Sequence, residues 1–576
     1  MGKPGTKLAR LAVPHGTGRH GVSQAALLES YSRELSKVDQ PEDAYRCAIP
    51  LEHRKRFGQF FTPLPIAELM AEWVQAINPK TILDPAVGPG VFPRLLRKQC
   101  PEAVLTCIDV DDIALTAAQN TLSDSHNEFL RQDFLTWEDE RLFDAAIANP
   151  PYLRHHDVHY PNDIFDLVGK RNRVRLSRLS NIYVLFILEI CRRLRAGGRA
   201  AVIVPGEWVN ANFGDTLKRW LVSNGVLHTL LYFSHASTQF DDALTTASIL
   251  FLEKPVSTMR PDFIRTIFIQ DGCSLDEIRK SMQGKAAENS NIVVQEFSPE
   301  ELMEEKKWNH LLAHGLKEAL PGFVALGSLA ETRRGIATGC NSFFHLSNSA
   351  AQEFRIRSKN LTPCVGRAQD VAGSIFTEQD FNNLAANNTK TYLFDIKDSP
   401  DRSEAKYIQQ GEAKGLHQRF LCAARNGHWY AMEKRPPSAI WATVFGRKAM
   451  RFIYNAARVA NLTTFHCIYP KNESSDFAAA LTACLNSRLV QQLAQRQHRV
   501  YGGGLLKMEP KDLLDIEVPD LRKVSAKTLR ELAGLLKELD RVVRAKHDSA
   551  DVQGWLDAVV EAAAEEAQEV SATCAH

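Results

Sequence analysis

Between residues 81 and 204, short apolar runs alternate with segments long enough to form helices, and this alternation constrains the fold most strongly. The runs occupy residues 81–83, 105–108, 145–148 and 200–204. Such a rhythm is typical of strands joined by crossover helices and predicts an α/β fold with a doubly wound parallel sheet. Each run ends in a loop with Gly, Pro, Asp or Asn, where open sheets of this kind bind ligands.

The chain of 576 residues is longer than one core requires, so we expect at least one further large domain. A strand at 247–252 closes the α/β region, and 254–312 is interpreted as a bridge. Short, irregular, aromatic-rich pieces then predict an α+β domain. Residues 525–546 have one apolar helical face, and 548–568 form either a second helix or a frayed tail. The expected domains are an N-terminal extension at 1–50, a catalytic domain at 51–310, an α+β domain at 311–524 and a helical tail at 525–576.

Composition excludes several classes of protein. No apolar run approaches the roughly 18 to 20 residues that span a bilayer, so no membrane partner is expected. Residues 1–21 lack the apolar core of a secretory signal, and we interpret them as a basic, flexible lead. The 11 cysteines are scattered singly without a CxxC pair, which indicates reduced thiols and a cytoplasmic location.

Local charge is more informative than the net charge of +2, since a basic face can be offset elsewhere. Residues 419–458 contain one acid, Glu433, and interleaved aromatic residues. Their eight basic residues are Arg419, Arg425, Lys434, Arg435, Arg447, Lys448, Arg451 and Arg458. This composition suits phosphate neutralisation and groove contacts, and also suits a solvated basic face with core aromatics.

The turn at residues 84–90, Asp-Pro-Ala-Val-Gly-Pro-Gly, directly follows the first apolar run and precedes a helical stretch at 91–99. Its glycines would let the backbone approach a bound nucleoside, although such a turn often has no ligand. The spacing differs from GxGxxG, and no GK[ST] phosphate loop is present, so dinucleotides and nucleoside triphosphates are disfavoured. A smaller nucleoside ligand remains.

Acids follow the next two strands. Asp109 ends the second run, where an acid hydrogen-bonds ribose hydroxyls in such sheets, and Asp111 suits an N-cap for the next helix equally well. After the third expected strand, Asp133 can accept from an adenine amine and Phe134 can pack on the adenine ring. An ordinary loop acid and a core phenylalanine are the alternative.

The fourth run ends in Asn149-Pro150-Pro151-Tyr152, the most specific motif of the chain. Two prolines stiffen the loop and remove backbone donors, so its carbonyls act only as acceptors. The Asn149 amide oxygen and a proline carbonyl would accept both hydrogens of an aromatic amine, which favours the pyramidal nitrogen that can attack a methyl group. Tyr152 would supply a stacking face for a base swung out of a duplex.

With these motifs the chain resembles the gamma-class N6-adenine DNA methyltransferases, the Taq-type enzymes of restriction-modification systems, from about residue 54 to 519. The resemblance includes the segment Gly58-Gln59-Phe60-Phe61-Thr62-Pro63 and implies a class I methyltransferase domain, S-adenosylmethionine as cofactor and a C-terminal target-recognition domain. The implied cofactor residues are Thr62, Pro63, Asp84, Ala86, Gly88, Asp109, Asp133 and Phe134. The implied catalytic residues are Asn149, Pro150, Tyr152 and Phe240, the last as a second aromatic against the flipped adenine.

The resemblance implies methyl transfer to the N6 of adenine in double-stranded DNA. It also implies a cognate restriction endonuclease, encoded separately, as a possible partner. Two alternatives stay open. The same tetrapeptide serves methyltransferases of RNA or of protein glutamines, which usually lack so large a basic C-terminal domain. A non-catalytic DNA-specificity protein would have damaged catalytic residues, whereas here they are intact.

Other chemistries have weaker support. Asp401 and Glu404 imitate a PD...ExK nuclease, but they are too close in sequence to flank one metal ion. Cys364 follows a proline like the nucleophile of cytosine methyltransferases, yet we expect a buried cysteine. Three histidines, His155, His156 and His159, are candidate metal ligands, but no cysteine is near them in the sequence. We therefore expect no metal and interpret this segment as a DNA-contacting loop.

Overall fold

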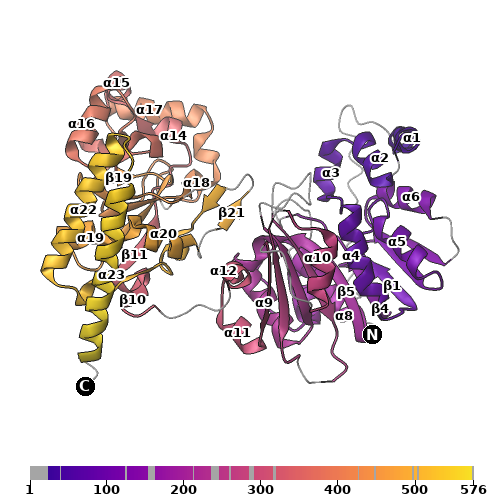
Figure 1. The fold of residues 1–576 in the computed structure, drawn as a ribbon. Helices are drawn as coiled ribbons and strands as arrows, with labels where there is room; N and C mark the ends of the chain where they lie inside the picture. Colours follow the sequence, from indigo (N-terminus) through magenta and orange to yellow (C-terminus); the bar gives the residue numbers. More distant parts are fainter. Residues whose placement is uncertain are drawn as a thin grey trace, which may run out of the picture. The chain divides into compact units, whose positions relative to one another are not determined.

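The computed structural model describes residues 24–38, 40–122, 126–153, 163–211, 213–234, 246–257, 261–270, 272–284, 291–314, 320–425, 427–446, 449–495, 499–501 and 505–573. Several positions discussed above lie outside these ranges: Phe240, Arg447, Lys448, His155, His156, His159 and residues 1–21. The chain divides into two compact units, Met1–Trp308 and Asn309–His576, which Figure 1 shows as ribbons. Each unit is described by itself.

Unit 1 is built on a nine-stranded sheet with the order β3-β2-β1-β4-β5-β7-β6-β8-β9. The strands are β1 Thr81–Asp84, β2 Val104–Asp109, β3 Asn127–Arg131, β4 Phe143–Ala148, β5 Leu194–Pro205, β6 Leu227–Phe233, β7 Ala247–Glu253, β8 Ile264–Ile269 and β9 Ile292–Phe297. Strands β1 to β5 pair in parallel, whereas β7 is antiparallel to β5 and β6. The expected α/β sheet is confirmed.

Helices cover both faces of this sheet. Ile82, Ala145 and Ala201 belong to the same core cluster as the buried side of α4 and α5. Their neighbours along the strands point to the opposite face and are buried as well. The helices of unit 1 are α1 Gln24–Leu35, α2 Pro41–Ala48, α3 Leu51–Phe57, α4 Leu64–Gln75, α5 Val91–Gln99, α6 Asp112–Thr121, α7 Ile164–Arg171, α8 Ile182–Arg193, the short 3-10 helix η1 Gly206–Val209, α9 Gly214–Ser223, α10 Leu275–Met282 and α11 Pro299–Glu304. Helix α12 Trp308–His314 begins at the last residue of unit 1 and continues into unit 2.

Residues 254–312 do not form the bridge that the sequence suggested. They contribute β8, which pairs in parallel with β6, and β9, which pairs with β8. Helix α10 returns to α4, where Arg279 forms an ion pair with Glu72 at 2.8 Å. The reason for the error is that β9 is an edge strand with mostly half-buried residues, so its apolar pattern is weak.

Unit 2 contains a five-stranded sheet, β11-β20-β16-β18-β14, and three smaller ones, β12-β15-β13-β19, β17-β22-β21 and β10-β23. The strands are β10 Phe323–Ala325, β11 Ala330–Arg334, β12 His345–Leu346, β13 Leu361–Val365, β14 Ile375–Phe376, β15 Tyr392–Phe394, β16 Ile440–Thr443, β17 Phe445–Gly446, β18 Phe452–Asn455, β19 Ala460–Asn461, β20 Phe465–Pro470, β21 Arg499–Tyr501, β22 Leu505–Lys507 and β23 Glu517–Pro519. The expected α+β architecture is confirmed.

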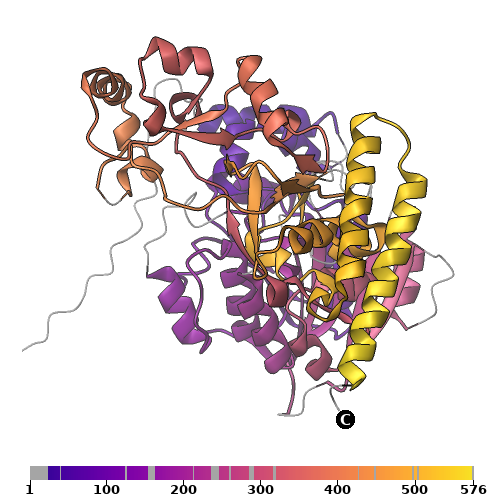
Figure 2. The same ribbon diagram turned by 90° about the vertical axis from the view of Figure 1, so that its left-hand side faces the viewer.

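Helices surround these sheets, and the last two helices of the chain form a pair. The helices are α13 Leu326–Leu329, α14 Asn341–Phe344, α15 Asn348–Glu353, α16 Glu378–Ala386, α17 Arg402–Ala413, α18 Phe420–Ala423, α19 Ser475–Asn486, α20 Arg488–Gln495, α21 Pro510–Leu513, α22 Ala526–Arg544 and α23 Ala550–Thr573, with the short 3-10 helices η2 Ser358–Asn360, η3 Ala368–Asp370, η4 Leu416–Gln418 and η6 Leu521–Lys523. Helices α22 and α23 lie side by side (Figure 2) and share one core cluster. The tail is therefore a second helix. Among the described residues, no helix has the length and apolar character needed to cross a membrane.

Candidate active site

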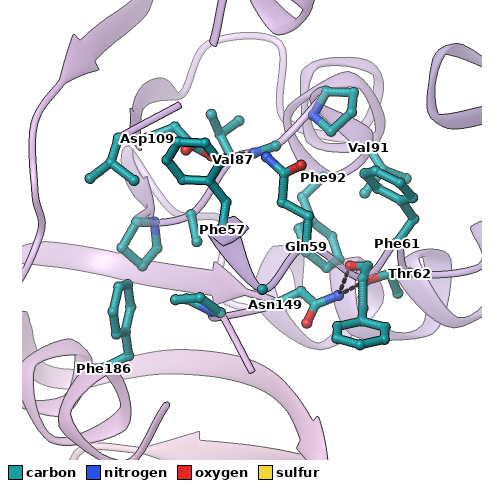
Figure 3. Close-up of a pocket in the computed structure, with 18 of the residues that line it drawn as sticks. Phe57, Gln59, Phe61, Thr62, Val87, Val91, Phe92, Asp109, Asn149 and Phe186 are labelled. Atoms are coloured by element: carbon teal, nitrogen blue, oxygen red, sulfur yellow. Dashed lines mark hydrogen bonds between the residues drawn. The ribbon is translucent and has the colours of Figure 1, made fainter. Parts of the chain in front are cut away.

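A cavity opens at the carboxyl ends of β1 to β4 in unit 1. Its wall contains the turn after β1, the end of β2, the loops after β3 and β4, and the segment before α4. About 770 Å³ of non-atom space lies within these walls, part of it open to solvent. Figure 3 shows Asp109 beside Val87 in one part of this cavity and Asn149 beside Thr62 in another.

The structure brings many of the predicted residues to this cavity. The predicted residues in its wall are Thr62, Ala86, Gly88, Asp109, Phe134 and Asn149. Pro63 instead precedes α4 as its N-cap, and Asp84 is buried at the end of β1. Asp133 accepts from the Leu135 N–H at 3.0 Å, while its neighbour Gln132 lines the cavity.

The Asn149 side chain is held by two hydrogen bonds. Its amide nitrogen donates to the Phe60 carbonyl at 2.7 Å and to the Thr62 hydroxyl at 3.0 Å (Figure 3). Both amide hydrogens are thereby used. Among the described residues, no donor bonds to the Asn149 amide oxygen, so this oxygen is available to accept a hydrogen bond from a ligand.

The segment Gly58–Thr62 runs alongside the Asn149-Pro150-Pro151-Tyr152 loop. The Tyr152 N–H donates to the Gly58 carbonyl at 3.2 Å, and the rings of Tyr152 and Phe60 stack with centroids 4.9 Å apart. Phe60 is a functional candidate that the sequence analysis did not single out. Its position within the segment Gly58–Pro63 was the sequence feature that could have indicated it. This segment lines the cavity and also positions the loop.

Gly58 is required by both conformation and space. It is the C-cap of α3, with φ at +62°. Residues other than glycine adopt this left-handed conformation at an energetic cost. A Cβ atom at this position would lie 2.6 Å from Leu153 Cγ and 3.0 Å from the Tyr152 nitrogen. The close approach of α3 to the loop therefore depends on the missing side chain.

At the other part of the cavity, Asp109 joins the turn after β1 to the turn before α6. Its carboxylate accepts from the Gly88 N–H at 2.9 Å and from the Asp111 N–H at 2.8 Å. Burial, followed by the charge of Asp111, raises the pKa of Asp109 to about 7. Gly88 has φ at +54°, and a Cβ there would meet nothing within 4 Å, so the turn needs glycine for its backbone angle.

Asp84 is a second buried acid near this region. One carboxylate oxygen accepts from the Ala86 N–H at 3.3 Å, whereas the other has no partner among the described residues. Burial raises the pKa of Asp84 well above its ordinary value, and the charge of Asp109 adds to this. The carboxyl group is thus short of donors.

Asp111 connects the N-terminal helices to the cavity. It caps α6 through the Ile113 N–H, which confirms its expected use as an N-cap. Its other oxygen accepts from Tyr45 at 2.8 Å and Gln59 at 2.7 Å and contacts His53 at 2.9 Å. Burial acts to raise the pKa of Asp111, but the bond and charge of His53, with Tyr45 and Gln59, lower it overall.

The N-terminal helices also reach the cavity through Glu42 of α2. Glu42 lines the cavity and forms a bidentate ion pair with Arg94 of α5, with distances of 2.7 and 2.8 Å. Tyr31 and Tyr45 are buried against α6 in the same region. The sequence assigned these helices to an extension, because a single acid in a helix produces no recognisable pattern.

Two other candidate chemistries have structural explanations. Cys364 is fully buried, and burial raises the pKa of its thiol. Asp401 caps α17, and the buried Glu404 binds Arg357 and Asn360. Burial acts to raise the pKa of Glu404, but the Arg357 hydrogen bond and its other bonds lower it to about 2. These acids therefore serve the structure of unit 2.

The basic stretch at 419–458 is only partly a surface. Arg451 donates to the carbonyls of Val371 and Gly373, and Arg425 donates to those of Thr338 and Trp429. Trp441, one of the interleaved aromatics, is fully buried. These two arginines are held by the fold, which corrects the interpretation of the whole stretch as a polyanion surface.

The strand order from β3 to β6, with β7 antiparallel and the cavity at the carboxyl ends, is that of a class I methyltransferase. The chain belongs to the family of Type II methyltransferases. It is 34% identical over 523 residues to the Type II methyltransferase M.AccI of Acinetobacter calcoaceticus, covering 90% of this chain and 96% of that one. It is also 27% identical to the Type II methyltransferase M.XamI of Xanthomonas campestris pv. amaranthicola, over 86% of this chain and 91% of that one.

Three family descriptions match successive parts of the chain. They are the N-6 DNA Methylase at residues 48–99, the Eco57I restriction-modification methylase at 94–240 and the C-terminal domain of the Type II methyltransferase M.Eco57I at 301–560. A cryo-electron-microscopy structure of a DrdV–DNA complex is similar with a TM-score of 0.51 and 12% identity, over 90% of this chain and 59% of that one. The methyltransferase resemblance expected from the sequence is confirmed.

Proposed function

We propose that the protein is a site-specific DNA methyltransferase that transfers a methyl group from S-adenosylmethionine to the N6 of adenine. It would be the modification enzyme of a restriction-modification system. Family membership supports methyl transfer. The observation that carries the choice of an exocyclic amine is Asn149, whose amide hydrogens are both bound and whose oxygen remains an acceptor.

The cavity residues fit S-adenosylmethionine. Asp109, at the end of β2, would accept from the ribose hydroxyls, and the open space at Gly88 would admit the nucleoside. Phe134, in the cavity wall, would pack on the adenine ring. When bound, the cofactor supplies an electrophilic methyl group on a positively charged sulfur.

The chain's own residues would prepare the target amine. The Asn149 oxygen and the Pro150 carbonyl would accept its two hydrogens and turn its lone pair towards the methyl group. Tyr152 would stack on the flipped base. Burial raises the pKa of Tyr152, so its ring stays neutral. Positioning and hydrogen bonding are the catalytic contributions, and no covalent intermediate is required.

Double-stranded DNA is the proposed substrate, and unit 2 is the proposed target-recognition part. Two relatives that align with most of this chain are both Type II methyltransferases, and the M.Eco57I C-terminal family covers most of unit 2. This favours DNA over RNA or a protein glutamine. A separately encoded endonuclease with the same recognition sequence is the corresponding proposed partner.

The test is Asn149→Ala, which removes the amide acceptor. We expect methyl transfer to unmethylated bacterial genomic DNA to fall by about 10²–10³-fold or more, as for loss of an electrostatic catalytic group, while cofactor affinity is retained. Labelled transfer and mass spectrometry of the digested nucleosides would give the rate and the modified base. Asn224→Ala, at the exposed end of α9, is the matched control. Modification of cytosine, or full activity in Asn149→Ala, would refute the proposal.

A further inference from the structure

A second basic segment lies in unit 1, from the last turn of α7 into the connection to α8. Five of its nine residues are basic: Lys170, Arg171, Arg173, Arg175 and Arg178. The nearest acids along the chain are Asp166 before it and Glu189 after it. The segment therefore has a strong local positive charge that the net charge of the chain conceals.

Most of this charge is exposed to solvent. Arg171 is the exception, because it donates to the Leu135 carbonyl at 3.1 Å and approaches Glu189 at 3.6 Å. Lys170, Arg173 and Arg175 are exposed and have no ion-pair partner among the described residues. Arg178 approaches Asp166 at 3.4 Å with both side chains largely exposed, and such pairs are weak.

The backbone that carries these cations is fixed. Asn172 is buried and donates to Glu189 at 2.9 Å and to the Val168 carbonyl at 3.0 Å. Its own carbonyl accepts from the Trp220 indole at 3.0 Å. Arg173 adopts φ of +53°, a conformation that is costly for a residue with a side chain and persists only where its surroundings enforce it. The cations are therefore presented on a rigid turn.

The turn leads directly to the catalytic loop. The Ile182 N–H, at the start of α8, donates to the Leu153 carbonyl at 3.1 Å, and the Tyr183 ring lies 6.4 Å from that of Tyr152. Arg178 precedes Ile182 by four positions, which is at most about 14 Å of chain. At roughly 3.4 Å per nucleotide along one strand, this length corresponds to about four nucleotides measured from the start of α8.

We propose that Lys170, Arg173, Arg175 and Arg178 bind the phosphate backbone of DNA next to the flipped base. The inference rests on the proposed function, since it takes DNA as the substrate. Backbone contacts fix the position of a protein on the duplex without reading its sequence. The exposed arginines of this turn suit that task, whereas Arg425 and Arg451 of unit 2 are already bound to carbonyls of their own unit.

The experiment uses the full chain with Arg175→Ala and Arg178→Ala combined, because both side chains are exposed and their loss should leave the fold intact. Binding to a DNA duplex of about 30 base pairs with arbitrary sequence is measured as a function of salt. Each lost phosphate contact should reduce the slope of log affinity against log salt by about 0.9, so we expect a decrease of about 1.8. The affinity for S-adenosylmethionine should not change.

The matched control combines Lys98→Ala with Lys280→Ala, two exposed positions on α5 and α10 that remove the same charge elsewhere on unit 1. This control should retain the wild-type slope. An unchanged slope in the arginine variant, or an equal decrease in both variants, would overturn the inference. Methyl transfer by the wild type separates the two proposals. Transfer with an unchanged slope removes only the inference. A reduced slope without any transfer supports phosphate binding by this turn and removes the proposed function.

Discussion

The two ends of the cavity differ in how completely their polar groups are bonded before a ligand arrives. At the catalytic end, both amide hydrogens of Asn149 are bound to the Gly58–Thr62 segment. Near the nucleoside end, the buried Asp84 has one carboxylate oxygen without a partner in the described part of the chain, and burial raises the pKa of Asp109 to about 7. The catalytic end therefore has its donors bound and one acceptor open, the Asn149 oxygen, whereas the nucleoside end has two buried acids whose pKa is raised.

This difference follows from what each end has to do. A group that stabilises a transition state is most effective when it needs no rearrangement during the reaction, so Asn149 is fixed by its neighbours. A group that binds a ligand must keep free acceptors for the ligand's hydroxyl and amino groups. Its incomplete bonding in the free protein costs free energy, which the ligand offsets when it binds.

Among substitutions that leave Asn149 in place, the largest expected effect comes from breaking the catalytic end at Gly58. In Gly58→Ala, the new Cβ would collide with Leu153 and press on the backbone of Tyr152. We expect kcat to fall by about 10²-fold, because small displacements of reacting groups have effects of that size. Cofactor affinity should change much less. Steady-state kinetics and calorimetric titration with S-adenosylmethionine would measure the two effects.

Gly272→Ala is the matched control for this substitution. Gly272 also has positive φ, at +82°, but its Cβ would only reach ordinary contact with Asn291 at 3.6 Å. Both variants incur the roughly 1–2 kcal/mol of left-handed backbone strain, and only Gly58→Ala adds the collision. Equal activities of the two variants would show that the Gly58 contact does not position the loop.

A smaller effect is expected at the nucleoside end, in the pH dependence of cofactor binding. Asp109 is ionised above about pH 7 and takes up a proton below it. Ribose hydroxyls donate to the ionised carboxylate, so bound ligand favours loss of that proton. Affinity should therefore weaken as the pH falls from 8 to 6, by at most about tenfold per unit for one proton. Titration calorimetry at several pH values would measure this dependence.

The control for that dependence is Asp109→Asn, which cannot ionise. It should bind S-adenosylmethionine about tenfold more weakly than the wild type at pH 8, since an amide is a poorer partner for two hydroxyls. The change in affinity near pH 7 should disappear in this variant. Asp84→Asn retains Asp109, so a pH dependence that vanishes in Asp84→Asn would assign the titration to Asp84 instead.

The sequence predicted those parts of the site that depend on local order. Asp109 and Asn149 each follow an apolar run, and parallel strands bring their carboxyl ends together. The contacts of Glu42 with Arg94 and of Phe60 with Tyr152 join segments more than 50 residues apart, and no local pattern encodes them. The same reason explains Arg451, whose partners are carbonyls near residue 372, about 80 positions away.

Thr62 offers the finest test of the difference between the two ends. The sequence assigns it to the cofactor, whereas in the structure its hydroxyl accepts a hydrogen bond from the Asn149 amide at 3.0 Å. Thr62→Val keeps the shape of the side chain and removes the acceptor. One net hydrogen bond corresponds to about 0.5–1.5 kcal/mol, so we expect kcat to fall by up to about tenfold with unchanged cofactor affinity, and Thr62→Ser to restore it. Kinetics and titration calorimetry on the three proteins decide the matter. If Thr62→Val instead weakens cofactor binding at unchanged kcat, Thr62 belongs to the nucleoside end, and Asn149 is positioned by the Phe60 carbonyl alone.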